Sequence, residues 1–259
     1  MSQILMLIPA RGGSRGVPRK NLVPLEGRPL IERAIAVCKG CRTPARIVVS
    51  SEDREIIEVA RRAGAEVPFV RPAELARDET PLVPVVAHAL DELSASGYRP
   101  EVLVLVQATS PFTRSSDIDR AVGLLLHNDI DVVYTVCPIA HPPHWAQVLD
   151  ETGEPRLLLG EEDLPGTARR QDLPTVYRPT GNFSVMRTEH FRSCGLDAPA
   201  RFFLPKPGQR SRAIVLDEVT SVDIDSIIDL ALARAIVDYE LRGNEASGAW
   251  KRLLGRGTP

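Results

Sequence analysis

Short apolar runs alternate with amphipathic segments along the first half of the chain. Runs rich in Val, Leu and Ile predict buried strands at 4–8, 46–50, 66–70, 101–106 and 131–136. The segments between them have helical spacing, at 28–40, 50–65, 80–97 and 115–129. We expect Pro68 to keep the third strand at an edge. We expect Ser50 or Ser51 to cap the second helix and Gly64 to end it. Strands that alternate with helices predict an α/β fold with a mostly parallel sheet flanked by helices.

The pattern changes after residue 137. Residues 140–160 show two short apolar stretches around the turn-forming sequence DETGE, with no helix between them. This predicts a small antiparallel lobe at 140–175. Segments 181–191 and 213–216 then return to the main sheet, and 223–243 predicts a long closing helix that ends at Gly243. We therefore expect one domain at 1–245, lobe included, and a tail at 246–259.

Composition restricts the function classes. The 259 residues are 43% hydrophobic and 25% charged with a net charge of −2, which is typical of a globular domain and argues against a basic nucleic-acid binder. No apolar run is long enough for a membrane span or an export signal, so we expect a cytoplasmic protein with reduced thiols. Cys38 and Cys41 have CxxC spacing, but no second pair completes a metal site, which favours a simple helix end.

The sequence IPARGGSRGVPRKN at 8–21 directly follows the first predicted strand. Open α/β sheets bind ligands at this carboxyl edge. The glycine spacing fits neither the dinucleotide fingerprint nor the P-loop. Arg11, Arg15, Arg19 and Lys20 point to an anionic ligand, and a triphosphate is the anion that most needs four cations. The alternative is a solvated loop whose cations face water.

Two aspartates stand two residues apart near the carboxyl end, at Asp223 and Asp225. In an extended segment such residues point the same way, so both carboxylates can face one Mg²⁺ ion while Ile224 packs. The alternative is that Asp225 only caps the closing helix, beginning with Ser226. The pattern alone leaves both interpretations open.

Five segments in order resemble the CMP-sialic acid synthetases, the acylneuraminate cytidylyltransferases. They are IPARGGSRGVPRKN, VRPAELARDETP (70–81), LVQATSPF (105–112), RRQDLPTVYRPTGN (169–182) and SVDIDSIIDLALA (221–233). The resemblance runs from about residue 4 to 235. It implies a Rossmann-like fold, a homodimer formed through the small lobe, and a Mg²⁺-dependent reaction. That reaction joins a nine-carbon keto-acid sugar to CMP from CTP and releases pyrophosphate.

The resemblance also implies residue roles. Catalytic roles fall to Arg11, Arg15, Lys20 and Asp225, and metal binding to Asp223 and Asp225. Substrate binding falls to Ser14, Asn21, Arg71, Gln107, Thr109, Ser110, Arg170, Gln171 and Arg178. Among these, Arg71 and Gln107 match positions at the cytosine base, and Arg170, Gln171 and Arg178 match positions around the sugar. For Arg71 the simpler interpretation is a surface salt bridge with Glu74.

The chain departs from the family pattern mainly on the sugar side. Where the family often reads NGAIY, this chain reads TGNFS at 180–184. Thr180 therefore replaces an Asn and Ser184 replaces a Tyr, with Asn182 between them. The sugar is therefore left open between sialic acid, a deaminated relative and a bacterial diamino nonulosonate. Two other functions stay open: a CMP-Kdo synthetase, whose loop fits poorly, and a catalytically inactive CTP-binding sensor or partner domain. The intact Asp pair and the cationic loop argue against the inactive alternative.

Overall fold

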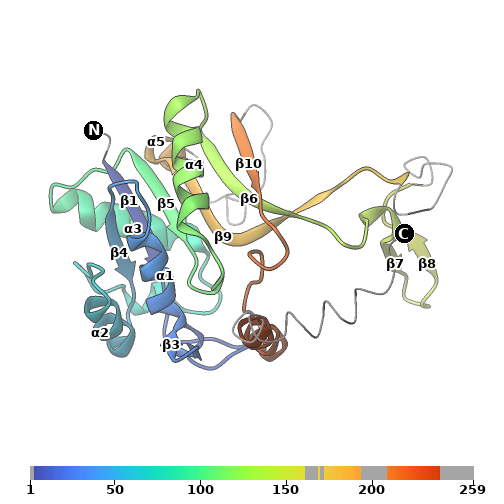
Figure 1. The fold of residues 1–259 in the computed structure, drawn as a ribbon, viewed down its shortest axis with the longest axis horizontal. Coiled ribbons are helices and arrows are strands. Elements are labelled where there is room, and N and C mark those ends of the chain that lie inside the picture. Colours follow the sequence, from blue (N-terminus) through green and yellow to red (C-terminus); the bar gives the residue numbers. More distant parts are fainter. Residues whose placement is uncertain (1–2, 161–168, 170–171, 194–208, 240–259) are drawn as a thin grey trace, which may run out of the picture.

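The computed structural model describes residues 3–160, 169, 172–193 and 209–239. Figure 1 shows an α/β body from which a thin two-stranded extension projects to one side. The body holds a six-stranded sheet in the order β10-β6-β9-β5-β1-β4. Its strands are β1 (Ile4–Pro9), β4 (Arg46–Ser50), β5 (Val102–Val106), β6 (Val132–Pro138), β9 (Tyr177–Arg187) and β10 (Ser211–Val215).

One strand of this sheet runs antiparallel to the others. β1 pairs in parallel with β4 and β5, and β10 pairs in parallel with β6. β9 runs antiparallel between β5 and β6. The predicted mostly parallel α/β fold is therefore confirmed. Because β9 runs the other way, its first half shares an edge with the carboxyl ends of β1 and β5.

Helices cover both faces, which is why the central strands are apolar throughout instead of alternating. Met6 and Ile8 of β1 pack towards α1 (Leu30–Lys39), α2 (Arg54–Arg62) and α4 (Ser115–His127). Leu5 and Leu7 face the opposite layer, where α3 (Leu82–Ala95) and α5 (Thr188–Ser193) lie. Short elements complete the body: β2 (Pro24–Leu25), β3 (Arg28–Pro29), and the 3₁₀ turns at Lys20–Leu22 and Ala73–Ala76.

Two local predictions are wrong. The strand expected at 66–70 is a single bridge between Glu66 and Val48, because Pro68 has no N–H to continue a ladder. The cap of α2 is Asp53, whose Oδ1 accepts hydrogen bonds from the N–H groups of Glu55 and Ile56. Gly64 ends that helix as expected, with a φ of 90° that glycine adopts without steric cost.

The predicted excursion after β6 forms an antiparallel pair, β7 (Gln147–Leu149) and β8 (Pro155–Leu157), which follows a 3₁₀ turn at Pro143–Trp145. Figure 1 shows this pair far from the main sheet, at the end of the chains that leave β6 and enter β9. Residues 161–168, 170 and 171 of the predicted lobe lie outside the described residues, so its boundaries stay a prediction.

The closing helix begins later than predicted. Residues 227–239 are helical, and Gly243 and the tail at 246–259 lie outside the described residues. Leu230, Ala233 and Val237 pack with Val17 and Ile224 in a small third apolar cluster. This cluster fastens the start of the closing helix to the glycine-rich loop. The two sequence motifs singled out above therefore meet in space.

Candidate active site

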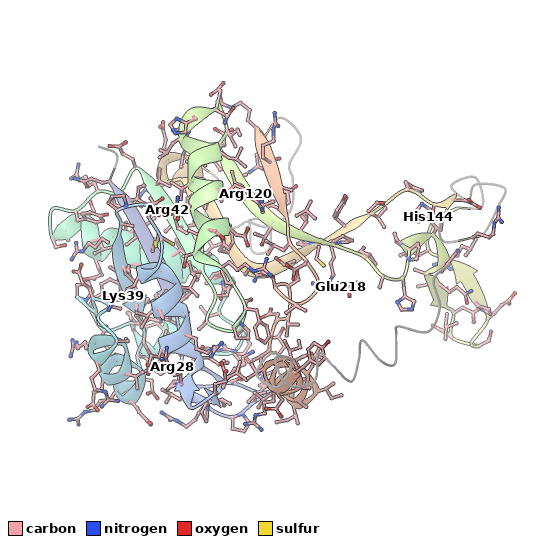
Figure 2. The ribbon with its side chains drawn as sticks, in the orientation of Figure 1. Arg28, Lys39, Arg42, Arg120, His144 and Glu218 are labelled. Carbon is pink, nitrogen blue, oxygen red and sulfur yellow. The ribbon has the colours of Figure 1, made fainter. Side chains whose placement is uncertain are left out.

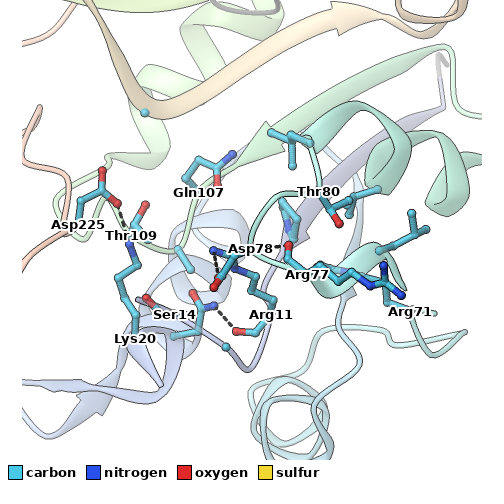
Figure 3. A pocket seen from close by; sticks show the side chains of 18 of the residues that line it. Arg11, Ser14, Lys20, Arg71, Arg77, Asp78, Thr80, Gln107, Thr109 and Asp225 are labelled. Atoms are coloured by element: carbon cyan, nitrogen blue, oxygen red, sulfur yellow. Dashed lines mark hydrogen bonds and ion pairs between the residues drawn. The ribbon is translucent and has the colours of Figure 1, made fainter. Parts of the chain in front are cut away.

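A cavity of about 410 Å³ lies at the carboxyl edge of β1 and β5. Figure 3 shows side chains entering it from segments far apart in the sequence. The predicted residues that line it are Arg11, Ser14, Lys20, Asn21, Arg71, Gln107, Thr109, Asp223 and Asp225. The structure thus brings together nine of the predicted site residues.

The glycines of the loop serve the protein's own contacts. A Cβ on Gly16 would lie 1.9 Å from the carbonyl oxygen of Asp225, and one on Gly12 would lie 2.5 Å from Oδ2 of Asp53. A Cβ on Gly13, which lines the cavity, would meet nothing within 4 Å. The sequence predicted close approach to an anion, but two of the three glycines allow close approach to this chain's own residues.

Two side chains fix the path of the loop. Oε1 of Glu52 accepts a hydrogen bond of 2.6 Å from the N–H of Gly12. Nδ2 of Asn21 donates to the carbonyl of Arg11 at 2.8 Å. Arg19 adopts a left-handed φ of 51° directly after Pro18, so the loop turns before the 3₁₀ turn at Lys20–Leu22 begins. The loop is therefore held rigidly at the cavity wall.

Each of the four loop cations pairs with a carboxylate. Arg11 lies 2.9 Å from Asp78, and Arg15 contacts both Asp78 and Glu79. Arg19 contacts Asp53 and Glu55. The Lys20 side chain is only 13% exposed, and its Nζ lies 2.7 Å from Oδ1 of Asp225. Arg15 is the predicted catalytic cation that lies outside the cavity lining, with 73% of its side chain exposed.

Arg71 is buried at the cavity and does not form the surface salt bridge with Glu74. Its Nε donates to Oγ of Ser50 and its Nη2 to the carbonyl of Ser50. Oε2 of Glu52 is buried 4.0 Å from Nη1 of Arg71 and has no hydrogen-bond donor among the described residues. Burial lowers the pKa of Arg71 to about 10, and the charge of Arg11 adds to this, whereas Glu52 opposes it.

The helix-cap interpretation of Asp225 is wrong. Ser226 caps the closing helix, because Asp229 accepts hydrogen bonds from both the N–H and the hydroxyl of Ser226, while the N–H of Asp229 donates to Oγ of Ser226. The carboxylate of Asp225 is 75% exposed and bonds to Lys20 instead. Ile224 is fully buried in the third apolar cluster, as the alternation of the two aspartates predicted.

Asp223 is the less exposed member of the pair. Its Oδ1 lies 3.4 Å from Oγ of Ser110, and Gly181 lies so close that a Cβ there would be 2.6 Å from Oδ2. Burial raises the pKa of Asp223, and the negative charge of Asp225 raises it further, against the hydrogen bond from Thr109 and the positive charge of Lys20. A cation at this position would offset that penalty.

The donor set fits a hard cation of the Mg²⁺ type. Such ions take one or two carboxylates and complete their shell with phosphate oxygens and water. Two aspartates line a cavity that also holds Arg11 and Lys20. Among the described residues there is no group of three or more His, Cys, Asp or Glu side chains that could hold an ion by themselves. A cation held here would therefore need oxygens from a bound ligand.

The residues predicted to bind the sugar are the ones that the structure brings together least. The guanidinium of Arg178 makes only 3.5 Å contacts to the carbonyls of Pro179 and Ser221 and does not line the cavity. Arg170 and Gln171 lie outside the described residues. Thr180 and Ser184 are buried in the sheet, where Thr180 bonds to Thr135 at 2.6 Å. These two departures from the family pattern therefore act on the cavity only through neighbouring residues.

Sequence reasoning missed several residues. Arg77, Asp78 and Thr80 line the cavity, and Gly181 abuts Asp223. All four lie inside segments that carried the family resemblance, so their place in the chain was the available signal. No feature of the sequence marked Glu52, because an acidic residue just before a helix is common. Cys38 and Cys41 lie at the end of α1, as expected, and burial raises the pKa of both thiols.

Comparisons with known proteins agree with this arrangement. The family profile described as Cytidylyltransferase matches residues 5–191. Pseudaminic acid cytidylyltransferase of Campylobacter jejuni is 29% identical over 232 residues, 90% of this chain and 95% of that protein. CMP-N,N'-diacetyllegionaminic acid synthase of Legionella pneumophila is 29% identical over 240 residues, 91% of this chain and 97% of that protein. N-acylneuraminate cytidylyltransferase of Escherichia coli is 28% identical over 91% of this chain and 52% of its own length.

The fold is also similar to that of a solved structure. The structure of CMP:2-keto-3-deoxy-manno-octonic acid synthetase complexed with CTP superposes with a TM-score of 0.68 at 16% identity, over 92% of this chain and 100% of that one. At that identity the likeness concerns the fold, which is Rossmann-like. No described helix is long and apolar enough to cross a membrane. From the profile match over residues 5–191 and the relatives over nine-tenths of its length, this chain belongs to the cytidylyltransferase family, as a relative of the CMP-sialic acid synthetases.

Proposed function

We propose that this cytidylyltransferase transfers CMP from CTP to a nonulosonic acid and releases pyrophosphate. The observation that supports it most is the cavity that holds Asp223 and Asp225 together with Arg11 and Lys20. Family membership supports CTP-dependent cytidylyl transfer, and the names of the relatives suggest the nonulosonic acid class.

The cations of the cavity suit the charge that moves in this reaction. As the sugar hydroxyl attacks the α-phosphorus, the bond to the bridging oxygen breaks and pyrophosphate carries negative charge away. Such transfer is mostly positioning and charge neutralisation. Arg11 and Lys20 line the cavity as the groups that meet this charge, and Ser14 and Asn21 stand beside them. Arg15 stands further out with Asp78 and Glu79, where it meets the outermost phosphate.

We assign Mg²⁺ to Asp223 and Asp225. When bound, the ion supplies charge neutralisation on the phosphates and lowers the pKa of a bound hydroxyl or water. The protein's part is to present Asp223 rigidly, since Ile224 is anchored by its N–H to the carbonyl of Thr109 at 2.9 Å. When CTP binds, the ammonium group of Lys20 would exchange its ion pair with Asp225 for a contact with a phosphate oxygen.

Gln107 and Arg71 are assigned to the cytosine base. Gln107 follows β5 directly, and its N–H donates to the carbonyl of Asn182 at 3.0 Å, which fixes where its side chain begins. An amide both donates and accepts, so it can pair with the amine and carbonyl of cytosine. Thr109 and Ser110 support the other wall, next to Asp223.

For the sugar end we propose a homodimer through the 140–175 lobe. The described part of the lobe exposes large apolar side chains, Trp145 at 39% and Leu149 at 66%. Two strands of three residues bury too little to keep such groups from water alone. By the family resemblance, Arg170, Gln171 and Arg178 match positions around the sugar pocket. Light scattering tests the assembly, and a fully active monomer would contradict it.

The catalytic proposal is tested by a pyrophosphate-release screen. Purified protein, CTP and Mg²⁺ are offered sialic acid, its deaminated relative, pseudaminic and legionaminic acids, and the eight-carbon acid Kdo. We expect release with at least one nine-carbon acid and none with Kdo. Release with Kdo alone would establish the eight-carbon alternative. Tight CTP binding without release on any acid would establish the inactive sensor.

A further inference from the structure

A second cavity lies on the other side of the segment that follows β5. It has a volume of about 700 Å³ and is bounded by the β2–β3 turn, α1, the start of α4 and residues 219–220. It shares no lining residue with the first cavity. None of the roles assigned above uses it.

The lining of this cavity is cationic. Three arginines, Arg28, Arg33 and Arg114, line it against one carboxylate, Glu26. Guanidinium groups are the side chains that bind phosphate oxygens in pairs of hydrogen bonds. Three of them at one cavity predict an oxyanion ligand.

The arginines are unequally compensated. Arg33 gives its Nη1 to Glu26 at 2.9 Å, but its Nε is buried and has no acceptor among the described residues. Arg114 gives its Nη2 to Asp217 at 2.8 Å. Arg28 is exposed at the foot of α1 (Figure 2), and within the described part of the chain no carboxylate lies within ion-pair distance of it. One full positive charge is therefore left over.

The start of α4 adds partial positive charge, because Asp117, the acid of its first turn, is already paired with Arg120 at 3.2 Å. Arg114 is the N-cap of this 13-residue helix and provides no side-chain cap, so among the described residues the first N–H groups of the helix have no side-chain acceptor. The hydroxyl of Ser115 donates to the carbonyl of Val37 at 2.7 Å, and within the described residues it accepts no N–H of the helix. Unsatisfied N–H groups at a helix start favour an anion. The arginines and the helix start face the same cavity.

The side chain of Asn182 connects the second cavity with the region of Asp223, the aspartate assigned to the metal. Thr113 and Thr220 line it, and Nδ2 of Asn182 donates to the hydroxyl of Thr113 at 2.9 Å and to the carbonyl of Thr220 at 2.7 Å. Asn182 follows Gly181, which abuts Asp223. We propose that this cavity is a second anion site of the protein, which binds a phosphate-class oxyanion through Arg28, Arg33 and the start of α4.

Calorimetry tests the site in a full-length Lys20→Ala background, which weakens phosphate binding in the catalytic cavity. Inorganic phosphate and glycerol 3-phosphate are titrated in separate arms at constant ionic strength, with chloride as the control anion. We expect one site per chain. Preference for inorganic phosphate identifies a free anion as the ligand, and preference for the ester identifies a phosphorylated metabolite.

Arg28→Gln is the decisive variant, because Arg28 is exposed and makes no internal ion pair, so folding should be unaffected. We expect phosphate affinity to fall at least about tenfold, as for loss of a charge-assisted hydrogen bond. Arg62→Gln removes the same charge from the exposed end of α2 and should leave affinity unchanged. Equal affinity in Arg28→Gln and Arg62→Gln, or binding no stronger than chloride, overturns the proposal. CTP-dependent turnover of the single variant Arg28→Gln, with Lys20 intact, should persist either way, which separates this site from the catalytic one.

Discussion

The proposed nucleotide site and the proposed sugar site are built in different ways. At the proposed nucleotide site each of the four loop cations is already paired with a carboxylate, as Lys20 is with Asp225 at 2.7 Å. At the proposed sugar site the guanidinium of Arg178 makes, among the described residues, two 3.5 Å contacts to carbonyls, and Arg178 does not line the cavity. One end is organised by a single chain before any ligand arrives, whereas the other lacks that internal support.

The difference shows what each end requires. A triphosphate can take over the bonds that carboxylates make to the loop cations, because exposed pairs such as Arg15 with Glu79 contribute little to stability and are readily broken. The sugar carboxylate has no such prepared partner among the described residues. Catalytic rate should therefore be most sensitive to changes at the nucleotide end.

The largest expected effect is at Asp223. Replacing Asp223 with Asn leaves phosphate charge less neutralised, so we expect turnover to fall about a hundred- to thousandfold, as when one electrostatic contact to a transition state is lost. Pyrophosphate release under saturating CTP and Mg²⁺ measures this. Turnover within a few-fold of wild type would show that the aspartate is not part of the catalytic centre.

The same variant should gain stability at neutral pH. A carboxyl whose pKa is raised on folding favours the folded state only while it is protonated, so this contribution is lost as pH rises from 3.8 through the raised pKa. Asp223→Asn removes the penalty, and its melting temperature should exceed that of wild type at pH 7 but not at pH 3.5. Mg²⁺ added together with CTP should raise the melting temperature of wild type more than that of the variant.

The next effect concerns the glycine loop. Gly16→Ala places a Cβ 1.9 Å from the carbonyl of Asp225, which is backbone and cannot rotate away. We expect a loss of about 1–3 kcal/mol in the free energy of unfolding, the usual cost of overpacking. Gly13→Ala is the matched control, because its Cβ meets nothing within 4 Å. Denaturant unfolding of both variants decides, and equal stabilities would mean that the loop does not touch the closing segment.

The smallest effect concerns base choice. Gln107→Ala removes an amide that can pair with cytosine, so the preference for CTP over UTP should fall roughly tenfold, the effect of about one hydrogen bond. Calorimetry with both nucleotides measures the ratio. A wild-type protein that binds UTP as tightly as CTP would remove the basis for this assignment.

Local patterns predicted most of the fold because its central strands are continuous apolar runs and its helices have regular helical spacing. The strand expected at 66–70 was wrong because a bridge at Glu66 depends on a partner, Val48, that the local sequence does not reveal. The cap of α2 fell on Asp53 instead of Ser50 or Ser51 because both serines are still buried at the end of β4. Local rules identified the element and missed its neighbours.

The site was predicted in the same uneven way. The loop cations and the aspartate pair could be identified from the sequence because charged residue types directly indicate anion and metal binding. The role of Gly16 was not, since it depends on the backbone of Asp225, more than two hundred residues later in the chain. Glu52 was missed for the same reason, because its value lies in its contacts with Gly12 and Arg71. Long-range contacts of this kind have no sequence period.

The central claim is that Asp225 serves catalysis and Asp229 serves the helix. The test compares Asp225→Ala with Asp229→Ala, each measured for melting temperature and for pyrophosphate release across a Mg²⁺ titration. Asp225→Ala should melt close to wild type, release pyrophosphate about a hundredfold or more slowly, and require more Mg²⁺. Asp229→Ala should lose about 0.5–2 kcal/mol of stability with the helix cap and keep near-normal turnover. Near-normal turnover in Asp225→Ala, or a loss of turnover only in proportion to stability, would contradict the account.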